Sequence, residues 1–289
     1  MMKRIQIFLL LIIVVCLLAP TANGELAPAY GIQLYSLQKW MDEDPDACLK
    51  QLADWGLKEV ETSVFTKQSA LELKGLLDKH GLRCTSHHVF PRDLDKNMDA
   101  VIAYAKAVGA TWVMSPLLPH KPPLTREQIP AIAERFNRWG KKLNQAGLRF
   151  AYHTHGQEFR SDAEGVLFDA LLDQTDPELV SYEVDVYWVL WGGGNPVDVL
   201  KRHGKRICAL HLKDMKKGTP TGSALQQKPP REAIVTLGSG MIDFSSILKL
   251  AREYDISRLY IEDESPNAIE QIPLSIEFLK KLSSRHPDS

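Results

Sequence analysis

Eight short runs of strand-forming residues alternate along the chain with longer helical patterns, and this alternation constrains the fold more than any other feature. Most runs begin about 30 residues after the previous one, which is the length of one strand–helix unit. Such alternation is typical of a parallel sheet, and eight units in a chain of this length predict closure into a single (β/α)₈ TIM barrel. The predicted strands are Tyr30–Leu34, Glu59–Thr62, Arg83–His87, Thr111–Ser115, Arg149–His153, Val180–Asp185, Cys208–Leu212 and Arg258–Glu262.

Glycines mark the ends of four predicted helices. Glycine readily adopts the left-handed backbone conformation that ends a helix and leads the chain into the next strand. A Thr-x-x-Gln sequence, Thr125 to Gln128, predicts a capping box at the start of the helical pattern 125–146. The four helix-ending glycines are Gly56, Gly81, Gly109 and Gly147.

No segment rich in serine, glycine or proline divides the chain, so residues 25–289 are predicted to form one barrel domain. The longest irregular stretch runs from Met215 to Met241 and follows the seventh strand. In a barrel this stretch is a loop over the C-terminal ends of the strands, where active sites lie. Irregular stretches of this length are usually functional or disordered.

The first 24 residues have the order of a secretory signal peptide. Lys3 and Arg4 precede an apolar run, Ile5–Leu18, and small residues ending at Gly24 follow it. This run of about 14 residues is shorter than the roughly 20 that span a bilayer, which favours removal near Gly24 over a membrane anchor. We therefore expect an exported protein, periplasmic or secreted, with no stable membrane span after removal of the signal.

Composition and charge exclude some function classes. The chain is 44% hydrophobic and 25% charged with a net charge of −1, which becomes −3 without Lys3 and Arg4. We expect no nucleic-acid partner, because nucleic-acid binders usually carry a basic surplus or patch. Cys48, Cys84 and Cys208 have no zinc-knuckle spacing. We interpret them as small buried hydrophobes, and one disulfide among them stays open.

Polar residues gather at the C-terminal ends of the predicted strands, where barrel enzymes place their chemistry. A barrel interior favours Val, Ile and Leu, and ionisable groups there are costly unless they are paired or bind a metal. A functional site explains this gathering better than isolated core groups do. The residues are Gln33 and Tyr35, Glu61, His87 and His88, Ser115, His153 and His155, Asp185, His211, Lys213 and Asp214, and Glu262, Asp263 and Glu264.

Three predicted strands each carry two such residues on one face, because side chains two apart on a strand point the same way. Carboxylates combined with imidazole form a mixed oxygen and nitrogen site. Such a site suits one divalent metal ion, Mn²⁺, Co²⁺, Zn²⁺, Mg²⁺ or Fe²⁺, and the lack of thiolates argues against a closed structural zinc site. The pairs are His153 with His155, Glu183 with Asp185, and His211 with Lys213.

Six motifs follow one another over essentially the whole chain after the signal. They are GIQLYSL (Gly31–Leu37), YHTHGQEF (Tyr152–Phe159), Asp185-x-Tyr187-Trp188, HLKDM (His211–Met215), LGSGMIDF (Leu237–Phe244) and YIEDE (Tyr260–Glu264). In this order they resemble the xylose isomerase-like TIM barrel family of sugar phosphate isomerases and epimerases, which also holds endonuclease IV and inosose dehydratase. The chain is most similar to an exported branch with a Tyr-His-Asn-His-x-x-Glu-Phe signature, and it has Thr154 in place of the asparagine.

The resemblance implies a metal centre with one ligand from each of the last four strands. Carried over to this sequence, the ligands are Glu158, Asp185, His211 and Glu262. Many members place the fifth-strand acid on the strand itself, where this chain has His153. His153 and Glu158 therefore both remain candidates for one position.

Acid–base and substrate-binding roles are assigned to further residues near these ligands. Alternatives are a helix-capping role for Glu158, an ion pair between Lys213 and Glu183, hydrogen-bonded core positions for the histidines, and plain packing for Trp188. The acid–base candidates are Glu158, Lys213, His153 and His155, and the substrate-contact candidates are Tyr35, His88 and Trp188.

These features favour a metal-dependent sugar isomerase or epimerase that removes a proton next to a carbonyl. An exported enzyme seldom meets sugar phosphates, so a non-phosphorylated sugar or keto-sugar is the expected small-molecule partner, and an oligomer is compatible with the chain. One alternative is a hydratase or lyase on a keto-sugar or keto-glycoside. Another is an exported, non-catalytic sugar-binding protein on the same barrel. The negative net charge disfavours an endonuclease relative.

Overall fold

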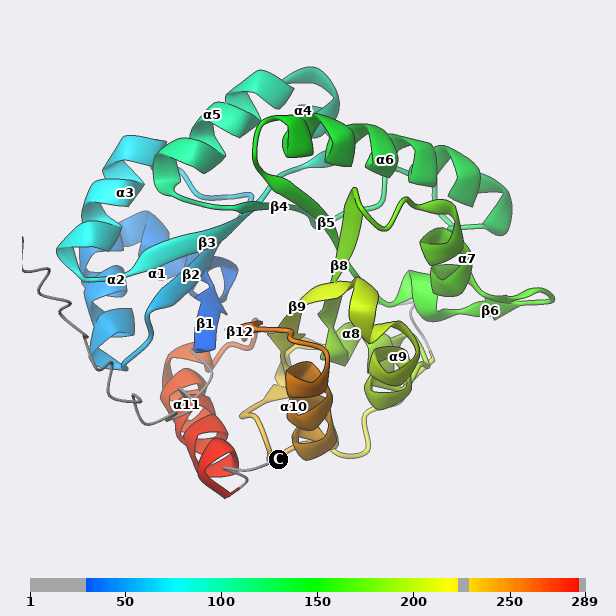
Figure 1. Ribbon diagram of the computed structural model, residues 1–289. Helices are drawn as coiled ribbons and strands as arrows, with labels where there is room; N and C mark the ends of the chain where they lie inside the picture. Colours follow the sequence, from blue (N-terminus) through cyan, green and yellow to red (C-terminus); the bar gives the residue numbers. More distant parts are fainter. Residues whose placement is uncertain (1–29, 223–228, 286–289) are drawn as a thin grey trace, which may run out of the picture.

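The computed structural model describes residues 30–222 and 229–285, and its eight parallel strands close into a barrel (Figure 1). Around the barrel the strands follow the order β1-β12-β9-β8-β5-β4-β3-β2. This confirms the predicted (β/α)₈ barrel. The strands are β1 (Tyr30–Gln33), β2 (Glu59–Thr62), β3 (Arg83–His88), β4 (Trp112–Ser115), β5 (Arg149–His153), β8 (Val180–Asp185), β9 (Ile207–Leu212) and β12 (Arg258–Ile261).

The predicted and observed strands agree to within one residue at each end. Two pairings in the barrel shift register, β2 with β3 between Val60 and Glu61, and β8 with β9 between Tyr182 and Glu183. Such irregularities re-aim the side chains next to them and are frequent beside active sites. Here each one adjoins a fully buried carboxylate, Glu61 or Glu183.

Helices surround the strands (Figure 1), because each helix carries the chain back along the outside of the barrel. The α-helices are α1 (Gln38–Glu43), α2 (Pro45–Asp54), α3 (Ala70–Lys79), α4 (Pro91–Lys96), α5 (Met98–Val108), α6 (Ile129–Gln145), α7 (Leu167–Gln174), α8 (Val186–Trp191), α9 (Pro196–His203), α10 (Phe244–Glu253) and α11 (Ala268–Arg285). Short 3₁₀ turns are η1 (Leu34–Leu37), η2 (Arg126–Gln128), η3 (Gln157–Phe159), η4 (Gly204–Arg206) and η5 (Arg231–Ala233).

The amphipathic helix α6 packs its apolar face on β5. Phe136 lies with its ring centroid 5.4 Å from that of Phe150 and 5.2 Å from that of Tyr152. Trp139 is buried beside them. Burial of such aromatic side chains contributes much of the stability of a core, because each removes a large apolar area from water.

The predicted glycine signals are correct, and the predicted capping box is wrong. Gly56, Gly81, Gly109 and Gly147 all have positive φ angles, between 66° and 89°. The Thr125 side chain does not cap the following turn. Gln128 instead bonds through its side chain to the backbone of Lys121 and Pro123, because the preceding loop folds back over it. The structure has a capping box at Ser69 and Glu72, at the start of α3.

The irregular stretch after the seventh barrel strand is anchored by one carboxylate. Its ends pair as a two-stranded hairpin, β10 (Asp214–Met215) with β11 (Ile234–Val235). The Asp214 carboxylate accepts hydrogen bonds from the backbone amides of Met215, Gly238, Gly240 and Ile242. Asp214 therefore fixes the backbone at Met215 and at Gly238–Ile242 and is not free to act in the site. A second short hairpin pairs β6 (Ser161–Asp162) with β7 (Gly165–Val166).

The three cysteines after the predicted signal are expected from the sequence to be small buried hydrophobic residues. Cys48, Cys84 and Cys208 are free in the described part of the chain. Burial raises the pKa of the Cys48 thiol to about 12, as expected for an unreactive core group.

The predicted signal segment, residues 1–24, lies outside the described residues. Within 30–222 and 229–285, none of the helices is both long and apolar enough to cross a membrane.

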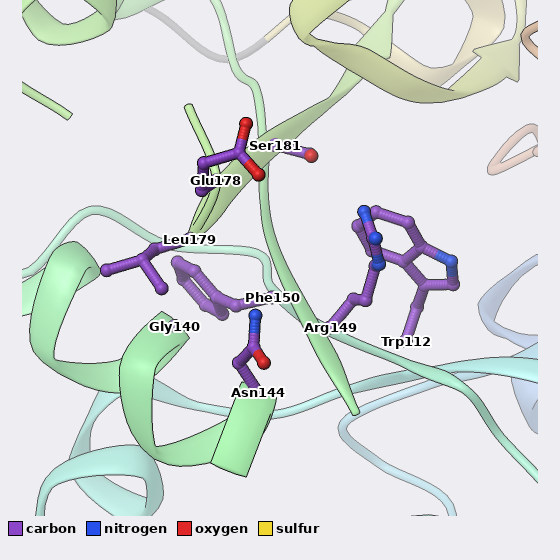
Figure 2. A pocket seen from close by; sticks show the side chains of 8 residues that line it. All are labelled: Trp112, Gly140, Asn144, Arg149, Phe150, Glu178, Leu179 and Ser181. Carbon is purple, nitrogen blue, oxygen red and sulfur yellow. The ribbon is translucent and has the colours of Figure 1, made fainter. Parts of the chain in front are cut away.

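A recess lies at the opposite end of the barrel from the strand C-termini (Figure 2). Trp112 and Arg149 begin β4 and β5, and Ser181 lies near the start of β8. Gly140 and Leu179 also line the recess. Residues at this end of a barrel usually serve stability rather than chemistry. None of the predicted site residues lines this recess.

We predict that Gly140→Ala destabilises the barrel. A methyl group at Gly140, inside α6, meets the backbone carbonyl of Leu179, which cannot rotate away as a side chain could. Overpacking of this kind costs about 1–3 kcal/mol, to be measured by urea denaturation. Gly75→Ala is the matched control, because Gly75 lies in α3 with open space around it, and there alanine should stabilise by up to about 1 kcal/mol. Equal effects of the two substitutions would contradict the packing argument.

Candidate metal centre

The barrel brings two groups of ionisable side chains together inside its C-terminal mouth. We call His153, Asp185, His211 and Glu262 the outer group, and Glu61, His88 and Glu183 the inner group. Asp185 ends β8 and Glu183 precedes it by two residues on the same strand, so Glu183, on which the inner group is centred, lies deeper in the barrel than Asp185. All seven side chains are buried.

The outer group has the geometry of a cation site. One potential ligand atom from each of its four residues lies within 4.8 Å of the others. His211 Nδ1 lies 3.1 Å from Glu262 Oε2. The mixture of two carboxylates and two imidazoles suits Zn²⁺, Co²⁺, Mn²⁺ or Fe²⁺. These residues therefore fit the predicted divalent metal ion by position and by chemistry.

One carboxylate oxygen of Asp185 accepts no hydrogen bond from the described part of the chain. Its Oδ1 caps α8 by accepting from the amides of Tyr187 and Trp188, at 2.8 and 3.1 Å. Its Oδ2 is buried and accepts no hydrogen bond, although Lys213 Nζ lies 3.2 Å away. A buried carboxylate oxygen without a donor is costly, and a bound cation would remove that cost.

Lys213 supplies a buried positive charge beside the outer group. Its Nζ lies 3.2 Å from Asp185 Oδ2, 2.6 Å from Glu262 Oε2 and 2.9 Å from Glu264 Oε2. Burial disfavours the ammonium form, but the carboxylates of Asp185, Glu262 and Glu264 outweigh it and raise the pKa of Lys213 well above its ordinary value. The structure thus pairs Lys213 with these three acids, and the alternative pairing with Glu183 is not observed.

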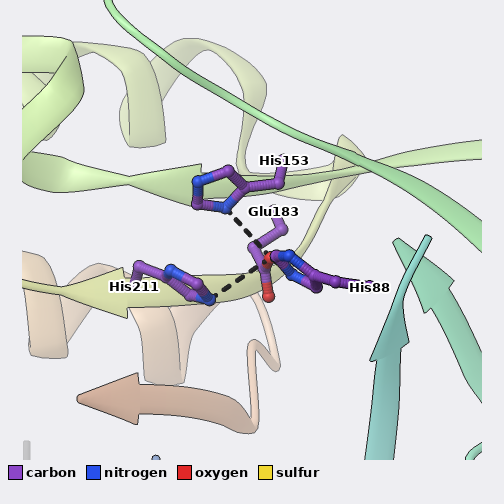
Figure 3. Close-up of side chains that lie close together, drawn as sticks. All are labelled: His88, His153, Glu183 and His211. Atoms are coloured by element: carbon purple, nitrogen blue, oxygen red, sulfur yellow. Dashed lines mark hydrogen bonds and ion pairs between the residues drawn. The ribbon is translucent and has the colours of Figure 1, made fainter. Parts of the chain in front are cut away.

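The inner group forms a compact set of contacts with two histidines of the outer group. His88 Nε2 lies 2.9 Å from both Glu61 Oε1 and Glu183 Oε2. His153 Nδ1 lies 3.0 Å from Glu183 Oε2, and His211 Nε2 lies 2.7 Å from Glu61 Oε1. The rings of His88, His153 and His211 converge on the Glu183 carboxylate in Figure 3.

In both groups, positively charged histidines are paired with negatively charged carboxylates. Burial opposes protonation of His88, but the charges of Glu61 and Glu183 raise its pKa to about 9. The acids likewise raise the pKa of His211 well above its usual range. Burial opposes ionisation of Glu183 and Glu262, yet the cationic neighbours hold the pKa of both well below the ordinary value. A metal ion would therefore replace protons on the histidines.

Glu158, one of the two fifth-strand candidates, lies outside the outer group. Its Oε1 accepts hydrogen bonds from Tyr152 Oη at 2.7 Å and from the His155 amide at 2.6 Å. Burial raises the pKa of Glu158 to about 7. Of the two candidates, His153 has a ligand atom among those of Asp185, His211 and Glu262, and Glu158 does not.

His155 and Trp188 flank the outer group on the β5 and β8 side. The His155 ring lies 4.9 Å from the His153 ring and 5.1 Å from the Trp188 ring. Burial, together with the positive charges of His153 and Lys213, lowers the pKa of His155 well below its usual value, so its imidazole is neutral. Trp188 also lies with its ring 5.8 Å from Lys213 Nζ.

The remaining predicted substrate contacts lie in different places. Tyr35 follows β1 and lies against Phe65, with ring centroids 5.6 Å apart, and its hydroxyl accepts a hydrogen bond from Arg231 at 3.4 Å. His88 is buried, with its Nε2 held between Glu61 and Glu183. Tyr35 thus lies on a different side of the barrel mouth from Trp188, and His88 points into the barrel.

The sequence places Glu61 and Glu264 among the polar residues at strand ends, and it offers Glu183 only as the alternative ion-pair partner of Lys213. The structure places Glu61 against His211, Glu183 against His153, and Glu264 against Lys213. The available signal for Glu183 was its spacing of two from Asp185, which puts both side chains on one strand face. Spacing alone does not show how deep each side chain lies.

Comparison with known proteins gives one family match. A model of the xylose isomerase-like TIM barrel matches residues 49–282. The inosose dehydratase of Bacillus cereus (strain AH820) is 29% identical over 152 residues, which cover 50% of this chain and 50% of that protein. An inosose dehydratase of Bacillus anthracis is 34% identical over 102 residues, 35% of this chain and 33% of that protein. The chain therefore matches half or less of the length of these curated relatives.

Solved structures share the fold along most of the chain. A sugar phosphate isomerase/epimerase from Parabacteroides distasonis ATCC 8503 has a TM-score of 0.74 at 24% identity, covering 89% of this chain and 96% of that one. The IOLI protein with a bound zinc atom has a TM-score of 0.69 at 14% identity, covering 89% and 97%. At these identities the likeness shows the fold alone.

We predict that Lys213→Met strongly destabilises the metal-free protein. The substitution leaves Asp185, Glu262 and Glu264 without their shared cation, and breaking a buried ion pair from one side costs roughly 3–5 kcal/mol. Urea denaturation in the presence of a chelator measures the loss, and added Co²⁺ should restore part of it. Lys216→Met is the control, because Lys216 is exposed, and it should leave stability unchanged. Equal stability of the two variants would contradict the charge assignment.

Proposed function

This chain belongs to the xylose isomerase-like TIM barrel family, and we propose that it is a metal-dependent enzyme acting on a non-phosphorylated sugar or keto-sugar. In this proposal the enzyme removes a proton next to a carbonyl and so isomerises or epimerises its substrate. The observation that carries the proposal is the outer group, four ligand atoms within 4.8 Å beside the buried Lys213 ammonium. The IOLI protein, which has the same fold, was solved with a bound zinc atom, and this supports a metal in the proposal.

Asp185, His211 and Glu262 would hold the cation, with His153 as a fourth donor. Asp185 Oδ2 accepts no hydrogen bond, although Lys213 Nζ lies 3.2 Å from it, so it has a lone pair for the cation. His211 Nε2 lies 2.7 Å from Glu61 Oε1, and a hydrogen bond there leaves the Nδ1 lone pair for the metal. A divalent ion supplies Lewis acidity, which polarises a carbonyl oxygen and makes the neighbouring C–H more acidic.

The side chains around the cation would bind the sugar and move the proton. Lys213 can donate a hydrogen bond to the oxygen on which negative charge develops. His155 is neutral and lies beside the outer group, so it can accept a proton from carbon. Glu158, with its pKa near 7, is a second acid–base candidate. Trp188 offers an aromatic face to the C–H groups of a sugar.

Hydration or elimination on a keto-sugar or keto-glycoside is the second candidate function. It begins with the same proton abstraction, and the match to inosose dehydratases favours it over unrelated chemistry. An exported, non-catalytic sugar-binding protein on the same barrel is a third candidate. The signal-like segment 1–24 supports export of the protein, and export supports a substrate without phosphate.

We predict that Asp185→Asn removes the catalytic metal and leaves the fold intact. Asparagine keeps the helix cap of α8 but loses the charge that a divalent cation requires. Metal content after dialysis against Co²⁺ should fall by about one equivalent, and kcat/KM should fall by at least about a hundredfold. Asp198→Asn, at an exposed position in α9, should change neither. Unchanged metal content in Asp185→Asn, or in the parallel variant His211→Ala, would refute the ligand assignment.

Solvent deuterium uptake tests the reaction class. We expect the metal-loaded protein in D₂O to incorporate deuterium next to the carbonyl of its sugar substrate, observed by NMR across hexoses, keto-sugars and keto-glycosides. Formation of an epimer or isomer identifies the first function, and loss of water or of an aglycone identifies the second. Saturable sugar binding without any exchange would overturn both and leave the binding protein.

A further inference from the structure

We propose that the inner group is a second divalent-cation site, in which Glu61, His88 and Glu183 are completed by His153. The proposed ligand is an ion that accepts both imidazole and carboxylate donors, such as Zn²⁺ or Co²⁺. This site lies deeper than the cation invoked for the proposed function, and its existence does not depend on which reaction the protein catalyses.

The first support is the crowding of one oxygen atom. Glu183 Oε2 has His88 Nε2 at 2.9 Å, His153 Nδ1 at 3.0 Å and His211 Nε2 at 3.3 Å, as Figure 3 shows for these rings. The other oxygen, Oε1, is buried and has no hydrogen-bond partner. A carboxylate that only accepted N–H groups would share them between its two oxygens, since each has two lone pairs. The three nitrogens and this oxygen lie within 4.8 Å of one another, which is close enough for donor atoms that share an ion.

The second support is the spacing of the donor atoms. Glu61 Oε1 lies 2.9 Å from His88 Nε2, His88 Nε2 lies 2.9 Å from Glu183 Oε2, and Glu183 Oε2 lies 3.0 Å from His153 Nδ1. Ligand atoms bound at about 2.0–2.2 Å in adjacent positions around one ion are roughly 3–3.5 Å apart. Ligand atoms of His88, Glu183 and His153 lie within 4.8 Å of one another, in a group that also includes His211, and Glu61 Oε1 adjoins this group at His88.

The third support comes from the strands themselves. The two register shifts described above adjoin Glu61 and Glu183, the two inner carboxylates. Both side chains are fully buried, and buried carboxylates are costly without compensating charge. A divalent ion would neutralise this pair and leave His88 and His153 as neutral ligands.

The two sites can be filled together because each imidazole serves one ion. His211 presents Nδ1 to the outer group, and its Nε2 faces Glu61 Oε1 at 2.7 Å as a hydrogen-bond donor. His153 presents Nδ1 to Glu183 and the inner site, so with both sites filled it is no longer the fourth donor of the outer cation. The outer cation then keeps Asp185, His211 and Glu262, and three protein ligands leave positions open for a substrate, as in catalytic metal sites.

Metal counting on the full chain tests the proposal. After dialysis against Co²⁺ and removal of excess ion, we expect about two cobalt ions per wild-type chain and about one in His88→Gln, measured by inductively coupled plasma mass spectrometry. The ion lost should be the one that Asp185→Asn retains, so the visible absorption spectra of the two variants should differ. A combined His88→Gln and Asp185→Asn variant should hold none.

His87→Gln is the matched control. His87 neighbours His88 on β3, but its Nδ1 pairs with Thr62 at 2.6 Å and its ring stacks on Tyr104, outside the inner group. It should retain both cobalt ions. Circular dichroism checks the fold, and Glu61→Gln, nearly identical in shape, replaces His88→Gln if that variant fails to fold. One ion in the wild-type chain, with none lost in either inner-group variant, would overturn the proposal.

The outcome is separable from that of the proposed function. Deuterium exchange with a single bound cobalt would leave the proposed reaction standing and refute the inner site. Two bound ions, one of them lost in His88→Gln, without exchange on any sugar would support the inner site and refute the proposed reaction.

Discussion

The mouth of this barrel is organised by the need to neutralise buried carboxylates. Asp185, Glu183, Glu61 and Glu262 lie out of water, and isolated charges in such places would cost several kcal/mol each. Lys213 and the histidines supply the opposing charge. The surrounding backbone serves the same end, because register shifts aim two of the acids inward and a helix begins at a third. The chemistry of the site follows from this arrangement, because clustered acids and imidazoles attract divalent cations.

Barrel closure is what permits the clustering. His211 and Glu61 are separated by 150 residues in the chain and are in direct contact, because β9 and β2 point their side chains into the same interior. No local structure could bring these groups together. The outer helices contribute by burying their apolar faces on the strands, as α6 does on β5. They hold the strands rigidly enough to keep ionisable groups at hydrogen-bonding distance.

The two ring nitrogens of His211 connect the outer and inner groups. His211 contacts Glu262 through Nδ1 and Glu61 through Nε2, so an acid in the deeper layer controls which nitrogen carries the proton in the upper one. A chain of such contacts links the site opening to the barrel interior. A substitution at an inner residue such as Glu61 or Glu183 should therefore alter the outer group, even if that residue does not contact the substrate.

Sequence alone determined the eight strands, the glycines that end the helices and the set of polar residues at strand C-termini. Those features follow from periodicity and from the common direction of parallel strands, which are local properties. The sequence left the choice between Glu158 and His153 open, and it offered an ion pair between Lys213 and Glu183 as an alternative. Only the tertiary structure placed His153 among the ligand atoms, separated inner from outer acids and gave Lys213 its three partners. The physical reason is that depth and partnership depend on barrel closure, strand stagger and side-chain rotamers, which are set by contacts between residues far apart in the chain.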